Sequence, residues 1–322
     1  MIEILRTEKG SAMPETIDEI HSGCWIDVVD PDATERIFLR DELGIVEEFL
    51  TSAFDSDESP HVDFDDDENQ ALIIFDCPVE VDAASLEEGE VQYETKPLSI
   101  VVLSDDDIMV TLSRSENSTV EGCKDGRIRR VNTAQRTKLL LQIMLDASRK
   151  YLSALRRINR KFEANESELR EHLKNEELIK MLGLQKSLVY FSTSLKANES
   201  VLNRIKAGRV LPLYEEDKDL LDDVFIELHQ AMEMCAITTS LLEGTMDTFS
   251  SIISNNANTS MHTLTIVMIV MTLPTIVFSF YGMNVEGLPH TESWMVAIIL
   301  AAILIAIAVV VFSVVSRLSN KR

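Results

Sequence analysis

TLTIVMIVMTLPTIVFSFYGMNV (263–285) and WMVAIILAAILIAIAVVVFSVVS (294–316) are two stretches of the chain that contain no charged side chain. A helix rises 1.5 Å per residue, so about 20 residues cross the roughly 30 Å hydrocarbon core of a bilayer. Both stretches are therefore predicted to be transmembrane helices. The loop between them (286–293) is expected on one side of the membrane, and the tail 317–322 on the other.

The charges beside the two spans predict their orientation. The loop contains Glu286 and Glu292 and neither Lys nor Arg, whereas Arg317, Lys321 and Arg322 follow the second span. Cytoplasmic flanks carry an excess of Lys and Arg. We therefore expect a multi-pass protein of the cell membrane, embedded in the lipid bilayer, with an extracellular loop and both termini in the cytoplasm.

The first span carries a polar face, whereas the second is apolar until Ser313 near its end. Read at spacings of three and four residues, one side of the first span collects hydroxyl and thioether groups. The same side continues upstream through small polar residues and a carboxylate. We call this set the polar stripe, and it consists of Asp247, Ser251, Ser254, Asn258, Met261, Thr265, Met268, Thr272, Thr275 and Ser279.

Two interpretations of the polar stripe are open. Ser and Thr hydroxyls in membrane helices commonly bond to their own helix or take part in helix packing. Alternatively, the stripe faces water. A coiled-coil packing seam would be apolar upstream of the span, so the polar residues from Asp247 to Asn258 favour the second interpretation. Because one helix cannot enclose water, a homo-oligomeric pore is predicted, with the second span outside the first.

The charge of the chain limits its partners. It has 322 residues, of which 54 are acidic and 30 are basic, for a net charge of −24. Residues 263–322 hold three basic and two acidic side chains, so residues 1–262 carry a net charge of −25. A nucleic-acid partner is not expected, because phosphate binding needs a basic face.

The soluble part is predicted to be an α+β domain (1–130) followed by a helical hairpin (131–212). Short β-branched runs predict strands over 71–81, 97–103 and 107–113, and TERIFLRDEL and VEEFLTSAF predict short helices. The second helix of the hairpin is expected from Asn175 to Lys206. No proline occurs between Pro212 and Pro274, so a stalk helix (213–262) is expected to continue into the first span.

No catalytic motif is found. The sequence lacks a Walker loop, a GxGxxG motif and an HExxH motif, and an enzyme is therefore not expected. The acidic run Asp63–Glu68 lacks the glycine of a calcium loop and is interpreted as a solvated loop, with weak attraction of divalent cations as the alternative. The cysteines form neither a zinc motif nor a disulfide framework; they are Cys24, Cys77, Cys123 and Cys235.

The sequence Tyr281-Gly282-Met283-Asn284 stands at the end of the first span, before a short loop and a C-terminal second span. In this position it resembles the signature of the CorA family of divalent-cation channels. The resemblance extends to SNNANTSMHTLTI (254–266), to the region of Pro274, to the long helix and to WIDVVDP (25–31). The loop departs from the family, because VEGLPHTES replaces the MPEL that commonly follows the motif.

The resemblance implies a homopentameric magnesium channel with a cytoplasmic α/β domain, a stalk helix that becomes the pore-lining span, and an outer second span. It assigns ion selection to Gly282, Met283 and Asn284, and a regulatory Mg²⁺ site between subunits to Asp223. The pore rings that it implies fall on members of the polar stripe, namely Asp247, Asn258, Met261, Thr272 and Thr275.

The chemistry of the motif suits a hydrated divalent cation. Mg²⁺ loses its water reluctantly, so a neutral ring of Asn284 amides and backbone carbonyls can hold the hydrated ion through hydrogen bonds. Glu286 and Glu292 are expected to raise the local cation concentration. Mg²⁺ is the expected ion, transported and regulatory, with Co²⁺ or Zn²⁺ as alternatives on the same scaffold. A membrane-anchored sensor without transport is the remaining alternative.

Overall fold

The computed structural model describes residues 1–8, 11, 13–81, 92–172, 175–208, 211–283 and 294–319. The chain divides into an N-terminal unit (Met1–Met246) and a C-terminal unit (Asp247–Arg322). The long helix α6 (Glu215–Tyr281) contributes residues to both units. Helix α7 (Trp294–Ser319) belongs to the C-terminal unit.

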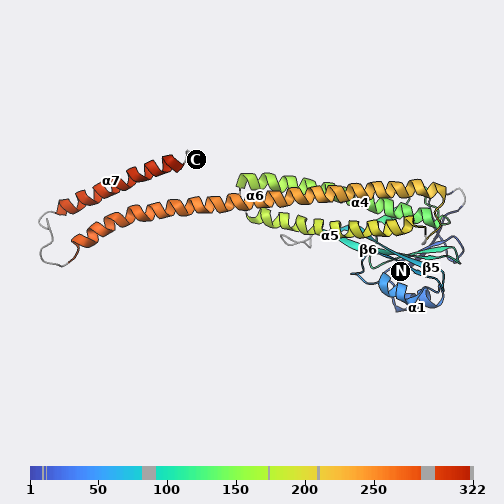
Figure 1. Ribbon diagram of the computed structural model, residues 1–322. Helices are drawn as coiled ribbons and strands as arrows, with labels where there is room; N and C mark the ends of the chain where they lie inside the picture. Colours follow the sequence, from blue (N-terminus) through green and yellow to red (C-terminus); the bar gives the residue numbers. More distant parts are fainter. Residues whose placement is uncertain are drawn as a thin grey trace. The chain divides into compact units, whose positions relative to one another are not determined.

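A mixed sheet forms the centre of the N-terminal unit (Figure 1). Among the described residues it has seven strands in the order β2-β1-β3-β7-β6-β5-β4. Strands β3 and β7 are parallel, and every other neighbouring pair is antiparallel. The strands are β1 (Ile2–Arg6), β2 (Glu15–Thr16), β3 (Trp25–Val29), β4 (Val62–Asp65), β5 (Gln70–Glu80), β6 (Tyr93–Leu103) and β7 (Ile108–Ser113).

Helices cover both faces of the sheet (Figure 1). On one face, α1 (Ala33–Asp41) and α2 (Glu47–Ala53) enclose an apolar cluster with β3, β5, β6 and β7. On the other face, α4 (Arg136–His172) and α5 (Asn175–Lys206) contact β5 and β6, and α3 (Ser118–Lys124) packs on α4. The N-terminal unit is therefore a three-layer α/β/α arrangement around two apolar layers.

Helix α5 is held on the sheet by aromatic rings and by one amide. The ring of Phe191 lies 5.0 Å from that of Tyr151 on α4, nearly edge-on, and 6.0 Å from that of Tyr93 on β6. Strand β4 pairs with β5 only as far as Ile73. Beyond that point Asn198 completes the edge, because its Nδ2–H donates to Asp76 O and its Oδ1 accepts from Asp76 N–H, both at 2.9 Å.

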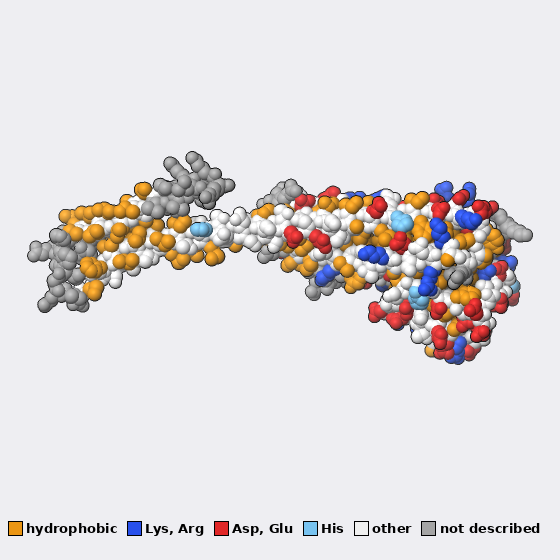
Figure 2. Space-filling view, in the orientation of Figure 1, with side chains coloured by type: hydrophobic (Ala, Val, Ile, Leu, Met, Phe, Trp, Pro, Cys, Tyr) orange, Lys and Arg blue, Asp and Glu red, His pale blue; other side chains and the backbone are white. Residues whose placement is uncertain are grey.

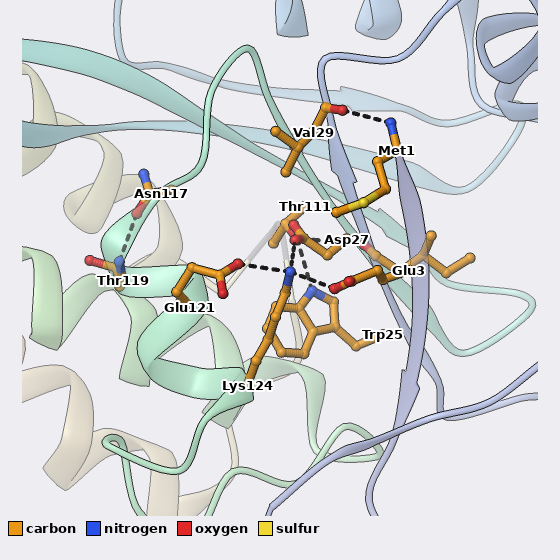
Figure 3. A network of polar contacts seen from close by, with 11 residues as sticks. Met1, Glu3, Trp25, Asp27, Val29, Thr111, Asn117, Thr119, Glu121 and Lys124 are labelled. Carbon is orange, nitrogen blue, oxygen red and sulfur yellow. Dashed lines mark hydrogen bonds and ion pairs between the residues drawn. The ribbon is translucent and has the colours of Figure 1, made fainter.

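A half-buried lysine joins α3 to the sheet (Figure 3). Lys124 Nζ contacts the carboxylate of Asp27 on β3 and lies 2.7 Å from Glu3 Oε2 on β1; a third carboxylate comes from α3 itself. Thr111 Oγ1 donates to Asp27 Oδ1 at 2.6 Å, and Trp25 Nε1 donates to Thr111 Oγ1 at 3.0 Å. Burial alone would lower the pKa of Lys124, but its hydrogen bonds to Asp27 and Glu3 raise that pKa. The lysine therefore stays charged and compensates the buried carboxylate.

Several sequence-based predictions are confirmed. The three expected strands correspond to β5, β6 and β7, and the two expected short helices to α1 and α2. The second helix of the hairpin has the predicted bounds, Asn175–Lys206. The helix expected after Pro212 runs without interruption from Glu215 to Tyr281 and includes Pro274.

The interpretation of Asp63–Glu68 as a loop is wrong for its first half. Asp63 and Asp65 lie in β4, an edge strand, and the residues after them form the turn to β5. Asp65 Oδ1 accepts from the backbone N–H groups of Asp67 and Glu68, both at 2.9 Å. The carboxylate thus closes a tight turn, a role that short acidic side chains commonly take. In the described part of the chain, no three His, Cys, Asp or Glu residues are grouped to hold a metal ion.

Substitution of Lys124 tests the buried ion pair. Lys124→Met leaves the carboxylate of Asp27, which is 2% exposed, without its cation, and should lower the free energy of unfolding by roughly 3–5 kcal/mol. Denaturant unfolding of the full chain in detergent, followed by tryptophan fluorescence, measures the change, since Trp25 lies in the network. Lys218→Met, which breaks an exposed pair with Glu215, is the control and should cost less than about 1 kcal/mol. Equal losses in the two variants would contradict this role.

Candidate functional site

Helix α6 carries the polar stripe on an exposed face throughout the C-terminal unit. All ten of its residues, from Asp247 to Ser279, are exposed in the single chain. Their spacing of three and four residues keeps them on one side of a helix with 3.6 residues per turn. The helix passes through Pro274 without ending, so the side chains before and after this proline stay in one row.

The opposite face of α6 carries an apolar stripe of lower exposure. Ile266, Val270 and Leu273 are half-buried and Val277 is buried; we call these four residues the back stripe. Val277 is two positions from Thr275, which corresponds to about 200° around the helix axis. The back stripe therefore faces away from the polar stripe.

Helix α7 has a matching row of low exposure. Ala301 is buried, and Leu304 and Ala308 are half-buried, again at spacings of three and four. Helix α7 and residues 247–281 belong to one compact unit. Small residues such as alanine let two apolar helices approach closely. The back stripe and this row of α7 are thus two apolar rows of low exposure in the C-terminal unit, and the polar stripe lies on the other side of α6 from the back stripe.

The hydroxyl groups of the polar stripe donate to their own helix. Thr265 Oγ1 donates to Met261 O at 2.8 Å, Thr272 Oγ1 to Met268 O at 2.7 Å, and Thr275 Oγ1 to Met271 O at 2.9 Å. The first interpretation of these hydroxyls is therefore confirmed for the three threonines. This bonding is compatible with a water-facing stripe, because a hydroxyl that donates to its own helix keeps oxygen lone pairs that accept hydrogen bonds. Such a row favours water molecules that point their hydrogens outward, as the hydration shell of a cation does.

From Leu264 onward the surroundings of the stripe are strongly apolar. In Figure 2, hydrophobic side chains gather over the C-terminal part of α6 and over α7, whereas charged side chains gather on the N-terminal unit. Among the described residues, α6 is long and apolar enough to cross a membrane, and α7 contains the shorter apolar run Ile298–Val310. Many of these side chains are exposed in the single chain, among them Leu264, Met271, Ile276, Ile299 and Val310.

The signature motif begins at the point where α6 ends. Gly282 N–H donates to Phe278 O at 2.9 Å, which closes the last turn. A Cβ atom at Gly282 would lie 3.0 Å from the same carbonyl oxygen, so the close return of the chain favours glycine here. Tyr281 is the last helical residue, and Met283 is exposed. Asn284, Glu286 and Glu292 lie outside the described residues.

Asp223 is an exposed residue in the third turn of α6. It is therefore too far along to cap the helix. Asp217 takes the position at the start instead, because its Oδ2 accepts from the backbone N–H of Tyr214 at 3.1 Å. The neighbouring Asp222 lies 3.7 Å from Lys206 Nζ. This geometry excludes a capping role for Asp223.

Comparison with known proteins gives the family. Residues 21–317 match the family model described as CorA-like Mg²⁺ transporter protein. The chain belongs to this family. A CorA relative from Methanocaldococcus jannaschii, named cobalt/magnesium transport protein CorA, is 27% identical over 97% of this chain and 98% of its own length.

Solved structures agree with the family assignment. The complete structure of the CorA magnesium transporter from M. jannaschii superposes with a TM-score of 0.78 at 25% identity, covering 97% of both chains. The ZntB cytoplasmic domain from Vibrio parahaemolyticus superposes with a TM-score of 0.57 at 13% identity, over 80% of this chain and 97% of that domain. At this identity the ZntB comparison shows a shared fold alone.

Cysteine labelling tests the two faces of α6 in this CorA-family protein. After removal of the native cysteines, Thr272→Cys and Thr275→Cys should react with small charged thiol reagents at least tenfold faster than Val270→Cys and Val277→Cys, because water is expected on the polar stripe alone. The reaction rates in the assembled protein, measured by mass spectrometry, give the comparison. Equal rates at all four positions would mean that the polar stripe is not the water-facing side.

Proposed function

We propose that the chain is the subunit of a homo-oligomeric channel that passes divalent cations, above all Mg²⁺, into the cytoplasm. The observation that carries this proposal is the polar stripe, an exposed row of polar and thioether side chains that continues into the uncharged span of α6. The stripe needs water, and lipid cannot provide it. Copies of α6 arranged around an axis, five by resemblance to the CorA family, give the row a common aqueous path.

Two membrane spans with both termini in the cytoplasm complete the proposal. The absence of charge in 294–316 and the basic residues that follow it support a second span. The loop with Glu286 and Glu292 then faces the outside, where its carboxylates raise the local concentration of cations. A divalent ion moving inward gains about 4.6 kcal/mol per 100 mV of membrane potential, twice the value for a single charge. Passive flow through a channel is therefore sufficient for uptake.

Selection is assigned to Gly282, Met283 and Asn284. A ring of neutral Asn284 amides can accept hydrogen bonds from the water shell of Mg²⁺ without removing it. The acceptor oxygens of Thr272 and Thr275 can accept hydrogen bonds from the same water shell farther along the pore. The names of the CorA relatives include both cobalt and magnesium, which supports Co²⁺ as a second ion, and Zn²⁺ is the remaining alternative.

Replacement of Asn284 tests the selectivity ring. Asn284→Ala should reduce Mg²⁺ uptake into proteoliposomes to the level of empty vesicles, since it removes the amides at the entrance. Size-exclusion chromatography in detergent must show that the oligomer is intact. Parallel assays with Co²⁺ and Zn²⁺ rank the ions for the unmodified protein.

The same experiment separates a channel from a membrane-anchored sensor. Glu286→Gln is the matched control. It should lower uptake only at low external Mg²⁺, because it reduces the local cation concentration and leaves the ring of Asn284 amides intact. Uptake by assembled Asn284→Ala at the unmodified rate would contradict the proposed channel.

Cytoplasmic Mg²⁺ is proposed to close the channel by binding between subunits at Asp223. Asp223 is exposed, and the described part of one chain gathers no group of three metal-ligating side chains around any position. A site at Asp223 would therefore draw ligands from a second copy. A ligand shifts the equilibrium between closed and open states only if it binds one of them better, and a shared site has that property.

Substitution of Asp223 tests this gating proposal. Asp223→Ala should raise the Mg²⁺ concentration that protects the assembled protein from limited proteolysis by roughly three- to tenfold. A partial shift is expected because other carboxylates remain. Asp222→Ala is the control, since Asp222 lies 100° away around the helix and pairs with Lys206. An unchanged Mg²⁺ dependence in Asp223→Ala, or an equal shift in Asp222→Ala, would contradict the role of Asp223.

A further inference from the structure

Two carboxylates are buried in the sheet of the N-terminal unit, and one of them has a neighbouring cation whereas the other does not. Asp27 has Lys124 as its cation. Asp76 on β5 is 7% exposed, and in the described part of the chain it forms no ion pair. The segment 82–91, which follows β5, contains neither Lys nor Arg. A buried carboxylate without a cation is costly when ionised, so Asp76 requires a separate explanation.

Asp76 lies where β5, α4 and α5 meet. Ser194 Oγ on α5 donates to Asp76 Oδ2 and lies 2.9 Å from Thr95 Oγ1 on β6. The backbone N–H and C=O of Asp76 both bond to Asn198 on α5, and Tyr151 OH on α4 donates to Asp76 O at 3.2 Å. These contacts make Asp76 the polar centre of the attachment between α5 and the edge of the sheet.

The other titratable groups around Asp76 stay neutral near pH 7. On its own strand, burial raises the pKa of Cys77 to about 12, and from α6 burial raises that of Cys235 to about 11. On α4, burial and the charge of Asp76 raise the pKa of Tyr151 well above its usual value. Lys150 and Asp146, also on α4, act on the pKa of Cys77 and pair with each other at 2.9 Å.

Strand β6 brings no charge to Asp76. Glu94 and Lys96 flank Thr95 and are exposed, and alternation along a strand turns them to the opposite face from Thr95. The remaining contacts from α5, Ser194 and Asn198, are neutral. Asp76 is therefore the buried group in this layer whose charge changes near neutral pH, since burial raises its pKa to about 6 against a partial opposing effect of the Ser194 hydrogen bond.

The same helix connects the sheet to α6 inside the N-terminal unit. Cys235 Sγ on α6 donates to Leu188 O on α5, and His229 Nε2 on α6 lies 2.7 Å from Glu199 Oε1 on α5. Leu188 and Glu199 flank the segment that contains Ser194 and Asn198. A change in the packing of α5 against β5 therefore acts on a helix that also contacts α6.

We propose that Asp76 makes the attachment of α5 to the sheet sensitive to pH, with tighter attachment in acid. When α5 separates from β5, water reaches the carboxylate and its pKa returns toward the ordinary value near 3.8. The attached state thus binds the proton more tightly than the separated state. Attachment is strongest below the ordinary pKa, weakens as the pH rises through the separated-state and attached-state pKa values, and reaches its minimum above about pH 6.

The proposal is tested by hydrogen exchange of the full-length protein in detergent at pH 5.0 and pH 7.5. After division by the intrinsic exchange rate at each pH, the opening constant of α5 amides near Ser194 should be about tenfold larger at pH 7.5. Asp76→Asn carries no charge at either pH, so its opening constant should be the same at both. Glu94→Gln, an exposed carboxylate on the neighbouring strand, is the control and should keep the tenfold difference.

A second variant makes the test independent of Asp76→Asn. Ser194→Ala removes the donor that favours the charged carboxylate, so the midpoint of the pH dependence should move to higher pH. A pH-independent opening of α5 in the unmodified protein, a full pH dependence in Asp76→Asn, or an unchanged midpoint in Ser194→Ala would overturn the proposal.

Discussion

A polar row on an apolar helix is the constraint on which the C-terminal unit depends. Hydrocarbon offers no partner for a hydroxyl group, and an unsatisfied polar group there is costly. Thr265, Thr272 and Thr275 satisfy their protons within α6, but their acceptor oxygens remain. The back stripe lies on the other side of α6 from this row, and the apolar α7 suits a position toward lipid. In one chain the polar stripe is therefore a surface without a partner. Its partner is proposed to be water that further copies of the chain enclose.

Helix α6 meets a different constraint inside the N-terminal unit. There it carries a buried, largely apolar row at spacings of three and four residues: Leu221, Val224, Leu228, Ala231, Cys235, Thr238 and Leu242. The first half of the helix is thus fixed by packing. Its packing partners include α5, which the ring of Phe191 and the amide of Asn198 hold on the sheet. The position of the first half of α6 in the unit depends on contacts that begin at the edge of β5.

Much of this architecture can be predicted from local sequence patterns. Strands β5 to β7 are β-branched runs, the hairpin and α6 have helical periodicity, and the two spans lack charge over a sufficient length. The strands that sequence analysis missed lack such a pattern. β3 contains Asp27, β4 contains two aspartates, β1 has a charged residue at two of its five positions, and β2 has only two residues. Asp27 is acceptable in a buried strand because Lys124, 97 positions later in the sequence, reaches it, and no local pattern contains that information.

In the candidate site, too, some features can be predicted from local sequence patterns, whereas others depend on three-dimensional geometry or on assembly. The polar stripe follows from periodicity alone, and its place along a pore stays a prediction, because most side chains of this part of α6 are exposed in the single chain. The direction of the threonine hydroxyls and the position of Asp217 at the start of α6 depend on hydrogen-bond geometry, which residue types do not determine. The resemblance to CorA assigned Asp223 to regulation, but its partner ligands depend on the assembly of copies and not on one chain. A regulatory site of this kind would be incomplete in one subunit.

The charge of the chain connects such a site to gating. With a net charge of −25 on residues 1–262, neighbouring copies would repel each other, and a bridging cation at Asp223 would relieve the repulsion only while the copies are close. Its loss would therefore favour separation of the copies, which links the internal Mg²⁺ concentration to the proposed opening of the pore.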